Sequence, residues 1–495
     1  MRLNELILGI DDLRLQSGDA GVDVRDLALD SRRLKSGALF AALPGSKLDG
    51  RAFVPAAVKA GASAILAPEG SSFADLPQGV AVLTAKEPRR ALALIAARFS
   101  GNQPHCIAAV TGTGGKTSTV AFARQLWSLE GREAASLGTL GVISRRVNDP
   151  GSLTTPDPIA LHRLLAQLAD NGVTHLAMEA SSHGLDQHRL DGVKVTAAVF
   201  TNLSQDHLDY HVDMARYFEA KLRLFSDLLP EGGTAVVNMK LAEAPRLIDV
   251  ARKRRQRLIT FGNGEADIRL LKQRPTPQGQ LLELSLFGAH HVTEFPVAGG
   301  FQAENLLAAL GLVIGSGSDA NKMAGLVGNL VGVPGRIQHV ADTPAGGAVY
   351  VDYAHKPGAL EAVLTTLRPH AARQLAVVFG CGGDRDRGKR PIMGEIATRL
   401  ADRVIITDDN PRSETPATIR AEILANAPGA VEVGDRAEAI RVAMSELREG
   451  DLLVIAGKGH ETYQIVGDKT YPFDDAEVAR QIAAELGGAP VRLVR

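Results

Sequence analysis

The sequence alternates between short β-branched runs and longer stretches rich in alanine and leucine along almost its whole length. Such alternation is typical of βαβ units, and hence of mostly parallel sheets covered by helices. The sequence therefore predicts an α/β protein, whose ligands bind beyond the carboxyl ends of the strands. The runs that we interpret as strands are Ile107–Thr111, His175–Glu179, Val195–Thr201, Thr234–Asn238, Val349–Asp352, Leu375–Gly380, Val404–Thr407 and Leu452–Ala456.

The chain has 495 residues, enough for about three domains at roughly 150 residues each. One boundary is expected near residue 88, where Thr84–Arg89 leads into a new helix. A second is expected at Val333–Arg336, where a Pro-Gly turn ends a helical stretch and a new strand pattern follows. The predicted domains are residues 1–88, 89–333 and 334–495.

Charge and cysteine content limit the classes of partner. Lys and Arg number 55 and Asp and Glu number 56, so the formal net charge is -1. That balance argues against nucleic-acid binding and against electrostatic attachment to a membrane.

The acidic residues Glu5, Asp11 and Asp12 do not suit a signal peptide, and no apolar run approaches the ~20 residues of a spanning helix. Two cysteines, Cys106 and Cys381, fit a reducing compartment. We expect a cytoplasmic monomer.

A glycine-rich segment follows the first of the central strands and precedes a helix over Val120–Leu129. Glycines let backbone N–H groups turn toward phosphate oxygens, and the helix N-terminus adds its positive end. Lys116 would neutralise the β- and γ-phosphates, and Thr117 would place a hydroxyl on Mg²⁺. The full Walker pattern has glycine where this chain has Val110, so the loop is a shortened variant; the alternative is a glycine turn with a chance lysine. The predicted nucleotide-binding residues are Gly112, Thr113, Gly114, Gly115, Lys116, Thr117 and Ser118.

Acidic and histidine residues follow two further strands. Glu179 ends one strand, and Asp206 and His207 follow the next. At the ligand edge of a parallel sheet a carboxylate can hold Mg²⁺ and a histidine can hold a second ion. The alternative for Asp206 and His207 is local capping of the next helix. Lys221 lies on a predicted helix with an apolar face, where a lysine by itself is usually a solvated surface charge.

Together these segments resemble the Mur ligases, the ATP-dependent amino-acid-adding enzymes of peptidoglycan precursor synthesis. The glycine segment is similar to the family's TGTNGKT, with Gly114 in place of asparagine. The other segments resemble the type that adds the third residue, to UDP-N-acetylmuramoyl-L-alanyl-D-glutamate. They are LDSR (Leu29–Arg32), TTPD (Thr154–Asp157), EASSHGLDQHR (Glu179–Arg189), NLSQDHLDYH (Asn202–His211), AENLLAA (Ala303–Ala309), PGR (Pro334–Arg336), VDYAH (Val351–His355), GCGGDRDRGKR (Gly380–Arg390), DNPR (Asp409–Arg412) and AGKGHE (Ala456–Glu461).

The resemblance implies a small N-terminal α/β domain that holds UDP, a central P-loop ATPase sheet, and a C-terminal Rossmann-like domain that receives the amino acid. Lys221 matches the family's carbamylated lysine, in which CO₂ turns an amine into an anion that helps bind Mg²⁺. With Lys116 it would be catalytic, as would Glu179 and His207; the implied metal ligands are Thr117, Glu179, His207 and carbamylated Lys221. Positions that match nucleotide-sugar-peptide contacts are Ser31, Thr154, Thr155, Ser181, Gln187 and Arg189. Positions that match the ATP-binding edge are Asn305, Arg336, Tyr353 and His355.

The third amino acid in this family is usually meso-diaminopimelate or L-lysine, which differ by one carboxylate. A site for diaminopimelate must present a cation to that group, since an unpaired buried carboxylate is costly. Arg412 offers a bidentate fork after a turn fixed by Pro411, and DNPR resembles the diaminopimelate version; the alternative is a surface arginine. The implied amino-acid contacts are Arg385, Asp409, Asn410, Pro411, Arg412, Gly457 and Glu461, with Glu461 on the distal ammonium.

The resemblance implies that the D-glutamate γ-carboxylate attacks the γ-phosphate of ATP, giving an acyl phosphate that the diaminopimelate amine then captures. Alternatives are the same ligase using L-lysine, a folylpolyglutamate synthase, a D-Ala-D-Ala-adding Mur ligase, or a P-loop protein that serves only as a nucleotide switch. The DNPR and SSHGLDQHR segments argue against the second and third of these.

Overall fold

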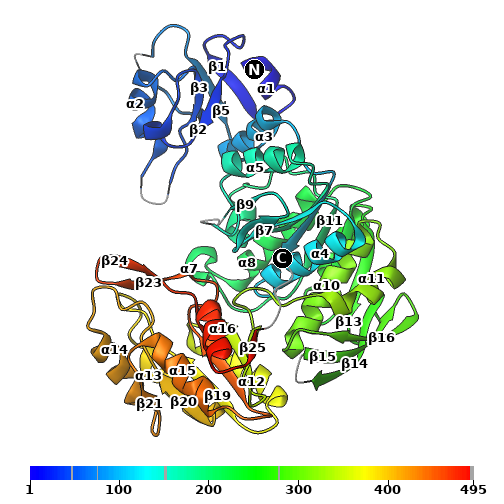
Figure 1. Cartoon of the computed structure of the whole chain (residues 1–495). Coiled ribbons are helices and arrows are strands. Elements are labelled where there is room, and N and C mark those ends of the chain that lie inside the picture. Colours follow the sequence, from blue (N-terminus) through cyan, green and yellow to red (C-terminus); the bar gives the residue numbers. More distant parts are fainter. Residues whose placement is uncertain (46–47, 75, 150–152, 277–278, 491–495) are drawn as a thin grey trace. The chain divides into compact units, whose positions relative to one another are not determined.

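The computed structural model describes residues 1–45, 48–74, 76–149, 153–276 and 279–490 (Figure 1). These residues form helices and mixed sheets throughout, so the predicted α/β class is confirmed. The chain divides into two compact units. The first comprises Met1–Thr260 and Gly311–Gly317, and the second comprises Phe261–Leu310 and Ser318–Arg495.

The first unit begins with a sheet in the order β1-β5-β4-β3-β2. β1 runs antiparallel to β5, and the other pairs are parallel. Successive side chains of β3 point to opposite faces: Leu39 joins the apolar cluster that includes Leu92, and Phe40 joins the one that includes Val54. The elements are α1 (Leu3–Ile7), β1 (Leu13–Ser17), β2 (Asp26–Ala28), β3 (Ala38–Ala41), α2 (Val54–Lys59), β4 (Ala64–Pro68), β5 (Ala81–Ala85) and α3 (Pro88–Ser100), with short 3-10 turns at Ser31–Arg33 and Gly50–Phe53.

A larger sheet follows, and its strands up to β13 lie in the order β13-β12-β11-β6-β10-β7-β8-β9. Its central pairs from β12 to β7 are parallel, whereas β7, β8 and β9 run antiparallel. The strands are β6 (Cys106–Thr111), β7 (Ala134–Gly138), β8 (Gly141–Ser144), β9 (Asn148–Asp149), β10 (His175–Glu179), β11 (Ala197–Phe200), β12 (Thr234–Asn238) and β13 (Arg257–Gly262).

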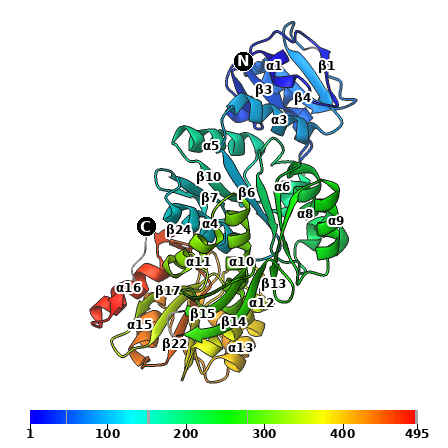
Figure 2. The same ribbon diagram turned by 90° about the vertical axis from the view of Figure 1, so that its right-hand side faces the viewer.

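Helices cover both faces of this sheet (Figure 2). One apolar cluster joins Ile107 of the sheet to Leu165, Leu222 and Leu247 on three helices. The helices are α4 (Lys116–Glu130), α5 (Pro158–Asp170), α6 (Ser182–Asp186), α7 (Leu208–His211), α8 (Met214–Arg223) and α9 (Ala244–Lys253), with a π-helical turn at Leu224–Leu228. The four strand predictions for this region are confirmed with small shifts of their ends.

The second unit begins at the end of β13, where Phe261 pairs with Ile268. An antiparallel meander follows, and its outer strand is largely exposed. Such strands alternate polar and apolar residues, so they lack the continuous β-branched run that indicates a buried strand. The elements are β14 (Ile268–Thr276), β15 (Gly279–Leu286), β16 (Ala289–Phe295), α10 (Gly300–Gly315), whose last residues belong to the first unit, α11 (Ala320–Leu326) and a 3-10 turn at Val327–Asn329.

The rest of the second unit is a sheet in the order β21-β20-β19-β22-β18-β17-β25, parallel from β21 to β18 and antiparallel at β17 and β25. The four remaining predicted strands are confirmed as β18, β19, β20 and β22. The strands are β17 (Gln338–Asp342), β18 (Ala348–Asp352), β19 (Leu375–Phe379), β20 (Arg403–Ile406), β21 (Val431–Glu432), β22 (Leu452–Ala456) and β25 (Ala489–Pro490), beside a separate hairpin of β23 (Tyr463–Val466) and β24 (Lys469–Pro472). The helices are α12 (Pro357–Leu367), α13 (Lys389–Leu400), α14 (Pro416–Leu424), α15 (Arg436–Glu446) and α16 (Asp475–Glu485), with a 3-10 turn at Arg368–His370.

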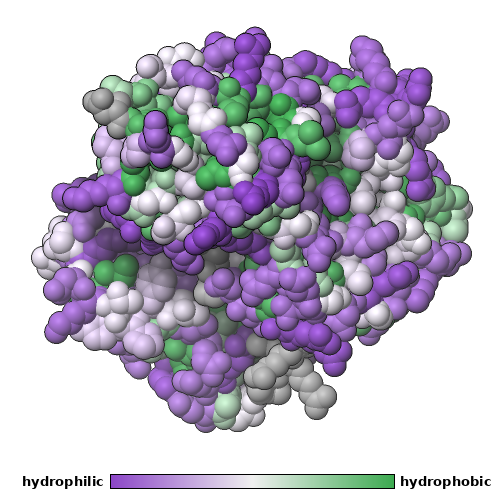
Figure 3. Space-filling model, turned by 90° about the horizontal axis from the view of Figure 1, so that it is seen from above, coloured by the Kyte–Doolittle hydropathy of each residue, from purple (hydrophilic) through white to green (hydrophobic). Residues whose placement is uncertain are grey.

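The face drawn in Figure 3 is mostly hydrophilic, with hydrophobic residues in small groups between polar ones. Among the residues that the structure describes, no helix is both long enough and apolar enough to cross a membrane.

Candidate active site

The glycine turn lies at the carboxyl edge of the larger sheet in the first unit. The turn follows β6 and leads into α4, as predicted. In the parallel register, Val110 of β6 pairs with Glu179 of β10, and Thr111 pairs with Phe200 of β11. The turn, Glu179 and the segment after β11 therefore meet at one edge of the sheet.

Two glycines of the turn are required by its geometry. Gly112 has φ 143° and Gly115 has φ 81°, a region that side chains with a Cβ rarely adopt. A Cβ on Gly112 would also lie 2.0 Å from the hydroxyl of Thr201. Gly114 is different, because a Cβ there would have Asn202 at 3.6 Å as its nearest neighbour, an ordinary contact. The backbone of the turn therefore leaves room for a Cβ at this position.

The segment after β11 holds the turn in place. The backbone N–H of Thr113 donates to the carbonyl of Asn202 at 2.9 Å, and the N–H of Gly114 donates to the side-chain oxygen of Asn202 at 2.8 Å. The hydroxyl of Thr201 donates to the carbonyl of Gly114 at 2.7 Å. The hydroxyl of Thr113 is 3.2 Å from that of Tyr217 on α8. The turn is thus bound to a second strand end before any ligand arrives.

Two lysines point at the first carbonyl of the turn. The Nζ atoms of Lys116 and Lys221 each lie 2.9 Å from the carbonyl oxygen of Gly112. Lys221 is only 1% exposed and its Nζ lies 4.4 Å from the ring centre of Tyr217, so the surface-charge alternative is wrong. Burial, with the nearby charge of Lys116, lowers the pKa of Lys221 to about 6. Lys221 is therefore mostly a neutral amine at pH 7.

Glu179 is a buried carboxylate that the loop after β7 holds. Its Oε1 accepts the backbone N–H of Thr139 at 2.9 Å, and its Oε2 accepts the hydroxyl of the same residue at 3.2 Å. That hydroxyl is also 3.2 Å from the hydroxyl of Thr154. Gly138 allows this approach, because a Cβ there would lie 2.1 Å from Oε1.

His207 follows β11 on a strained backbone and belongs to an aromatic group. It precedes α7 with φ 53°, and its side chain makes no capping hydrogen bond to that helix, so the predicted capping by His207 is wrong. Its N–H donates to the side chain of Asp206 at 2.9 Å, a bond between neighbouring residues. Its ring also lies 5.0 Å from that of His183 and 6.4 Å from that of Tyr217, measured between centres. His207 thus lies beside α8, which carries Lys221.

Residues matched to the nucleotide-sugar peptide form a second group in this unit. Arg189 donates to the carbonyl of Thr155 at 2.7 Å and to the side-chain oxygen of Gln187 at 2.7 Å. The hydroxyl of Thr155 bridges the carbonyl of Glu179 and the N–H of Ser181, each at 3.1 Å. This network joins these residues to Glu179. Ser31 stands apart from the network, in the 3-10 turn after β2.

The residues matched to the ATP-binding edge lie in the second unit. The guanidinium of Arg336 lies 5.1 Å from the ring centre of Tyr353, whose ring centre is 4.5 Å from that of His355. Burial lowers the pKa of His355 and raises that of Tyr353. Asn305 lies on α10, buried, and donates to the side chain of Gln302 at 2.9 Å.

The second unit contains a cavity of about 830 Å³ beyond the carboxyl ends of β18, β19, β20 and β22. All residues predicted to contact the amino acid line the cavity, except Pro411. It presents arginine and lysine side chains together with carboxylates. The lining residues are Tyr353, His355, Lys356, Pro357, Gly382, Arg385, Asp386, Gly388, Lys389, Ile392, Asp409, Asn410, Arg412, Gly457, Glu461 and Tyr463.

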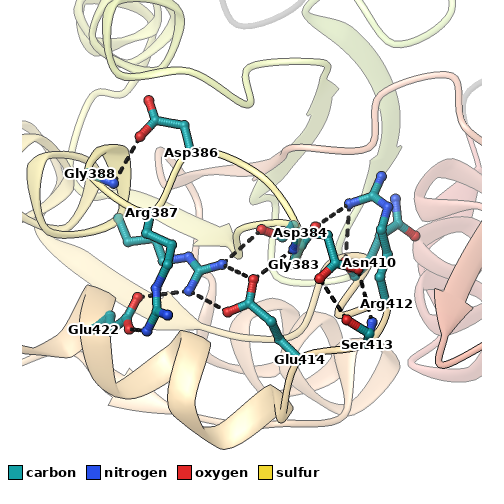
Figure 4. Close-up of polar contacts among 12 residues, drawn as sticks. Gly383, Asp384, Asp386, Arg387, Gly388, Asn410, Arg412, Ser413, Glu414 and Glu422 are labelled. Carbon is teal, nitrogen blue, oxygen red and sulfur yellow. Dashed lines mark hydrogen bonds and ion pairs between the residues drawn. The ribbon is translucent and has the colours of Figure 1, made fainter.

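Arg412 lines this cavity and is half-buried, so the surface-arginine alternative is wrong. Its guanidinium donates to the carbonyl of Gly383 at 2.8 Å (Figure 4). Its backbone has φ 51°, and the β23–β24 hairpin holds it there: its N–H donates to the carbonyl of Ile465 at 3.1 Å, and its carbonyl accepts the N–H of Gly467 at 2.7 Å. The side chain of Gln464 donates to the carbonyl of Asp409 at 2.7 Å.

A buried lysine organises the acidic side of the cavity. Lys458 is fully buried, and its Nζ lies 3.2 Å from the side-chain oxygen of Asn410 and 3.5 Å from the carboxylate of Glu461. The same Nζ lies 3.9 Å from the carboxylate of Asp409. Burial lowers the pKa of Lys458, and the two carboxylates oppose that effect.

A buried ion pair lies beneath the same loops. Arg436 donates to both carboxylate oxygens of Asp475 at 2.7 Å, and neither side chain is exposed. Its guanidinium also donates to the carbonyl of Ala456 at 3.0 Å and to that of Asp408 at 3.3 Å. The pair therefore ties the ends of β22 and β20 together below the cavity.

Sequence reasoning missed several of these residues. Thr139, Asn202 and Tyr217 hold the glycine turn and Glu179, and Lys458 and Gln464 hold the walls of the cavity. Asn202 and Lys458 lie inside segments quoted for the resemblance, so a closer reading of those segments could have found them. Nothing in the sequence marks Thr139 or Gln464, because their partners are backbone atoms or residues far away in the chain.

Three family models match the chain in order. The Mur ligase family catalytic domain matches residues 23–100, the Mur ligase middle domain matches 110–313, and the Mur ligase glutamate ligase domain matches 335–459. A UDP-N-acetylmuramoyl-L-alanyl-D-glutamate–2,6-diaminopimelate ligase of Bradyrhizobium diazoefficiens is 52% identical over 98% of this chain and 100% of that protein. A ligase of the same name from Caulobacter vibrioides is 52% identical over 91% of this chain and 94% of that protein.

Solved structures agree with these relatives. A structure of a UDP-N-acetylmuramoyl-L-alanyl-D-glutamate–2,6-diaminopimelate ligase superposes with a TM-score of 0.76 at 34% identity, covering 98% of this chain and 99% of that one. A MurF ligase from Thermotoga maritima, solved with ADP, has a TM-score of 0.59 at 19% identity over 94% of this chain and 98% of that one, which shows a shared fold. With three successive domain matches and relatives at about half identity over nearly its full length, this chain belongs to the Mur ligase family.

Proposed function

We propose that the chain is an ATP-dependent ligase that joins meso-2,6-diaminopimelate to the D-glutamate γ-carboxylate of UDP-N-acetylmuramoyl-L-alanyl-D-glutamate. The observation that carries the proposal is the cavity of the second unit, where Arg385 and Arg412 share one space with Asp409 and Glu461. Relatives at about 50% identity carry the name of this ligase. The reaction belongs to peptidoglycan precursor synthesis.

The charges of the cavity match the amino acid. Diaminopimelate has two ammonium groups and two carboxylates, whereas L-lysine lacks the distal carboxylate. Arg412 and Arg385 offer planar forks for carboxylates, and Glu461 offers an acceptor for the distal ammonium. With L-lysine, one arginine would keep no carboxylate partner, which disfavours lysine as the natural substrate.

Activation of the γ-carboxylate would take place at the glycine turn. The carboxylate oxygen attacks the γ-phosphorus of ATP, the bond to the bridging oxygen breaks, and ADP leaves with that oxygen. The amine then attacks the acyl carbon, phosphate leaves, and the amine gives up a proton. Lys116 and the N–H groups of the turn would offset the charge that accumulates between carboxylate and triphosphate. Asn305, Arg336, Tyr353 and His355 are also proposed to contact the nucleotide.

The donors at the sheet edge fit Mg²⁺. Glu179 accepts hydrogen bonds only from Thr139 among the described contacts, while a carboxylate has about four acceptor positions. No group of three His, Cys, Asp or Glu side chains gathers to hold a metal within the part of the chain that the structure describes. The set proposed here is compatible with that finding, because Thr117 supplies a hydroxyl and carbamylated Lys221 an oxygen anion, beside Glu179 and His207. Mg²⁺ would lower the repulsion between the reacting anions.

The neutral amine of Lys221 supports its carbamylation. Only an uncharged amine attacks CO₂, and burial keeps Lys221 uncharged near pH 7. The nitrogen forms a bond to carbon and loses a proton, and the side chain becomes an anion. The product would replace a buried neutral amine with an anion able to bind a metal ion.

The nucleotide-sugar peptide would lie along the first unit. Thr154, Thr155, Ser181, Gln187 and Arg189 already form one network with Glu179, and Ser31 would contact the UDP end. We propose that residues 1–88 hold UDP, that residues 89–333 carry out phosphoryl transfer and that residues 334–495 bind the amino acid; the three family matches support this division. We further propose that the protein is a monomer and that it is cytoplasmic; the two free cysteines support a reducing compartment.

A phosphate-release assay tests the proposal. Purified protein with ATP, Mg²⁺ and the UDP-dipeptide is offered meso-diaminopimelate, L-lysine, D-alanyl-D-alanine or L-glutamate. Release should require both the UDP-dipeptide and diaminopimelate. Release that requires no amino acid would favour a nucleotide switch, and a preference for L-lysine would favour the lysine-adding ligase.

A further inference from the structure

The two loops that carry the cavity arginines are joined outside the cavity by a network of charged side chains. Arg385 lies in the loop after β19, and Arg412 lies in the turn after β20. Neither arginine touches the centre of this network, which is formed by Arg390 and Glu414. The central pair therefore acts on the cavity only through the two loops.

Arg390 is the buried member of the pair. Its side chain is 0% exposed, and it donates to both carboxylate oxygens of Glu414, at 2.8 and 3.0 Å. It also donates to Glu422 at 2.7 Å and to the carbonyl of Gly382 at 3.2 Å. The guanidinium thus connects the start of one loop, the end of the other and helix α14.

Glu414 extends the connection to the loop of Arg385. Its Oε1 also accepts the backbone N–H of Asp384 at 2.6 Å, and the carboxylate of Asp384 accepts the hydroxyl of Ser413 at 2.7 Å (Figure 4). The hydrogen bond to Arg390 holds the pKa of Glu414 at about 2, so Glu414 is ionised at any working pH. Each loop therefore binds the other through charge-assisted bonds on the side away from the cavity.

On the cavity side the same loops position Arg412 closely. Gly383 donates its N–H to the carbonyl of Asn410 at 2.9 Å and accepts the guanidinium of Arg412 at 2.8 Å. A Cβ on Gly383 would lie 1.9 Å from the carbonyl oxygen of Pro411, and one on Gly382 would lie 2.8 Å from the guanidinium of Arg412. The loop after β19 and the turn after β20 are therefore packed in direct contact. A displacement of either one would also displace the arginine that the other carries.

We infer that Glu414, held by Arg390, is a specificity-determining positioning residue that fixes the spacing of Arg385 and Arg412 for the distal carboxylate of the amino acid. The inference rests on the proposed function and adds residues that touch no substrate. A displacement of about 1 Å in a positioning group can cost roughly 100-fold in rate. Disturbing this residue should therefore impair use of the amino acid strongly and use of ATP and the UDP-dipeptide only slightly.

The test uses the full-length enzyme and compares Glu414→Ala and Glu414→Gln with the wild type. Glu446→Ala is the matched control, because Glu446 forms a comparable bidentate pair with Arg403, at 2.9 and 3.0 Å, at the opposite end of β20. KM and kcat are measured for diaminopimelate, ATP and the UDP-dipeptide, and the diaminopimelate-to-lysine ratio of kcat/KM is measured for each variant. Thermal unfolding is followed in parallel.

Glu414→Ala should raise KM for diaminopimelate about tenfold or more, leave KM for ATP and the UDP-dipeptide within about twofold, and lower the diaminopimelate-to-lysine ratio. Glu414→Gln, which keeps an acceptor for the N–H of Asp384, should recover part of the loss, and Glu446→Ala should match the wild type. An unchanged ratio, or equal losses for all three substrates, would overturn the inference. If Glu414→Ala does not fold, the same comparison with Glu414→Gln decides. A wild-type protein that ignores diaminopimelate would instead refute the proposed function.

Discussion

The Nζ of Lys221, on α8, lies 2.9 Å from the carbonyl oxygen of Gly112, the first residue of the glycine turn. The lysine is buried and shares this acceptor with Lys116. An amine of this kind is neutral at pH 7 and is directed at the place where the nucleotide phosphates are proposed to bind. Its chemistry gives the first prediction.

Lys221 should take up CO₂. Protein incubated with ¹³C-bicarbonate at pH 8 should show one carbamate carbon signal by NMR, which Lys221→Ala should lack. The same variant should be nearly inactive, and added short carboxylates should restore part of its activity by replacing the lost anion. Lys253→Ala, which changes an exposed lysine, is the control and should keep both signal and activity. Full activity of Lys221→Ala in CO₂-depleted buffer would rule out the carbamate.

The buried amine should also make stability depend on pH. The pKa of Lys221 is lowered from 10.5 to about 6, so between these values the unfolded chain binds a proton that the folded chain does not. The free energy of unfolding should therefore rise with pH across that window, by up to about 1.4 kcal/mol per pH unit, and this contribution is lost as pH falls through 6. Urea unfolding in CO₂-depleted buffer at several pH values measures it. Lys221→Met should remove this slope; a wild-type slope that Lys221→Met retains would contradict the lowered pKa.

Substitution of two glycines of the turn should have very different effects: one should abolish most of the activity and the other should change it little. Gly112→Ala introduces a Cβ 2.0 Å from the hydroxyl of Thr201 at a φ that alanine avoids, so activity should fall by at least about 100-fold. Gly114→Asn places a Cβ at an ordinary contact distance from Asn202, and it should keep activity within about threefold and stability within about 0.5 kcal/mol. ADP release and thermal unfolding check both variants. A tolerated Gly112→Ala would mean that the turn is not built as described.

Arg412 should decide the choice of amino acid. Arg412→Ala removes a charge-assisted partner of the distal carboxylate, worth about 2–3 kcal/mol, so KM for diaminopimelate should rise roughly 30- to 150-fold. Use of L-lysine should change little, because lysine has no group for this arginine. Arg412→Lys should recover only part of the loss, since an ammonium cannot form the bidentate pair. Equal losses for both amino acids would remove Arg412 from substrate selection.

The strands and the sheet edge could be predicted from the sequence because their signals are local. The run before the glycine turn and the run ending at Glu179 are continuous apolar segments, and the structure places them side by side. The meander of β14 to β16 could not be predicted in this way, because most residues of β14 and β16 are exposed or only partly buried and form no continuous apolar run. The resemblance supplied the site residues, and the physical patterns alone would have left Lys221 on the surface.

The supporting contacts could not be predicted, because they join distant residues through backbone atoms. Gln464 reaches the carbonyl of Asp409, and Thr139 holds Glu179 through its own N–H. Such bonds require no particular residue type or spacing, so they cannot be recognised in the sequence. The burial of Lys221 could not be predicted for a similar reason. The helix pattern indicates on which face of the helix Lys221 lies, but not which segment of the chain covers that face.

The central claim is that ATP bound at the glycine turn transfers its γ-phosphate to a carboxylate. An amine then attacks the resulting acyl phosphate. This claim is tested most directly by UDP-dipeptide labelled with ¹⁸O in the D-glutamate γ-carboxylate. The labelled dipeptide is turned over with ATP and meso-diaminopimelate, and the released phosphate is examined by mass spectrometry. The account predicts one ¹⁸O atom in each phosphate, carried over when the acyl phosphate breaks. Unlabelled phosphate, formed while the peptide product accumulates, would contradict it.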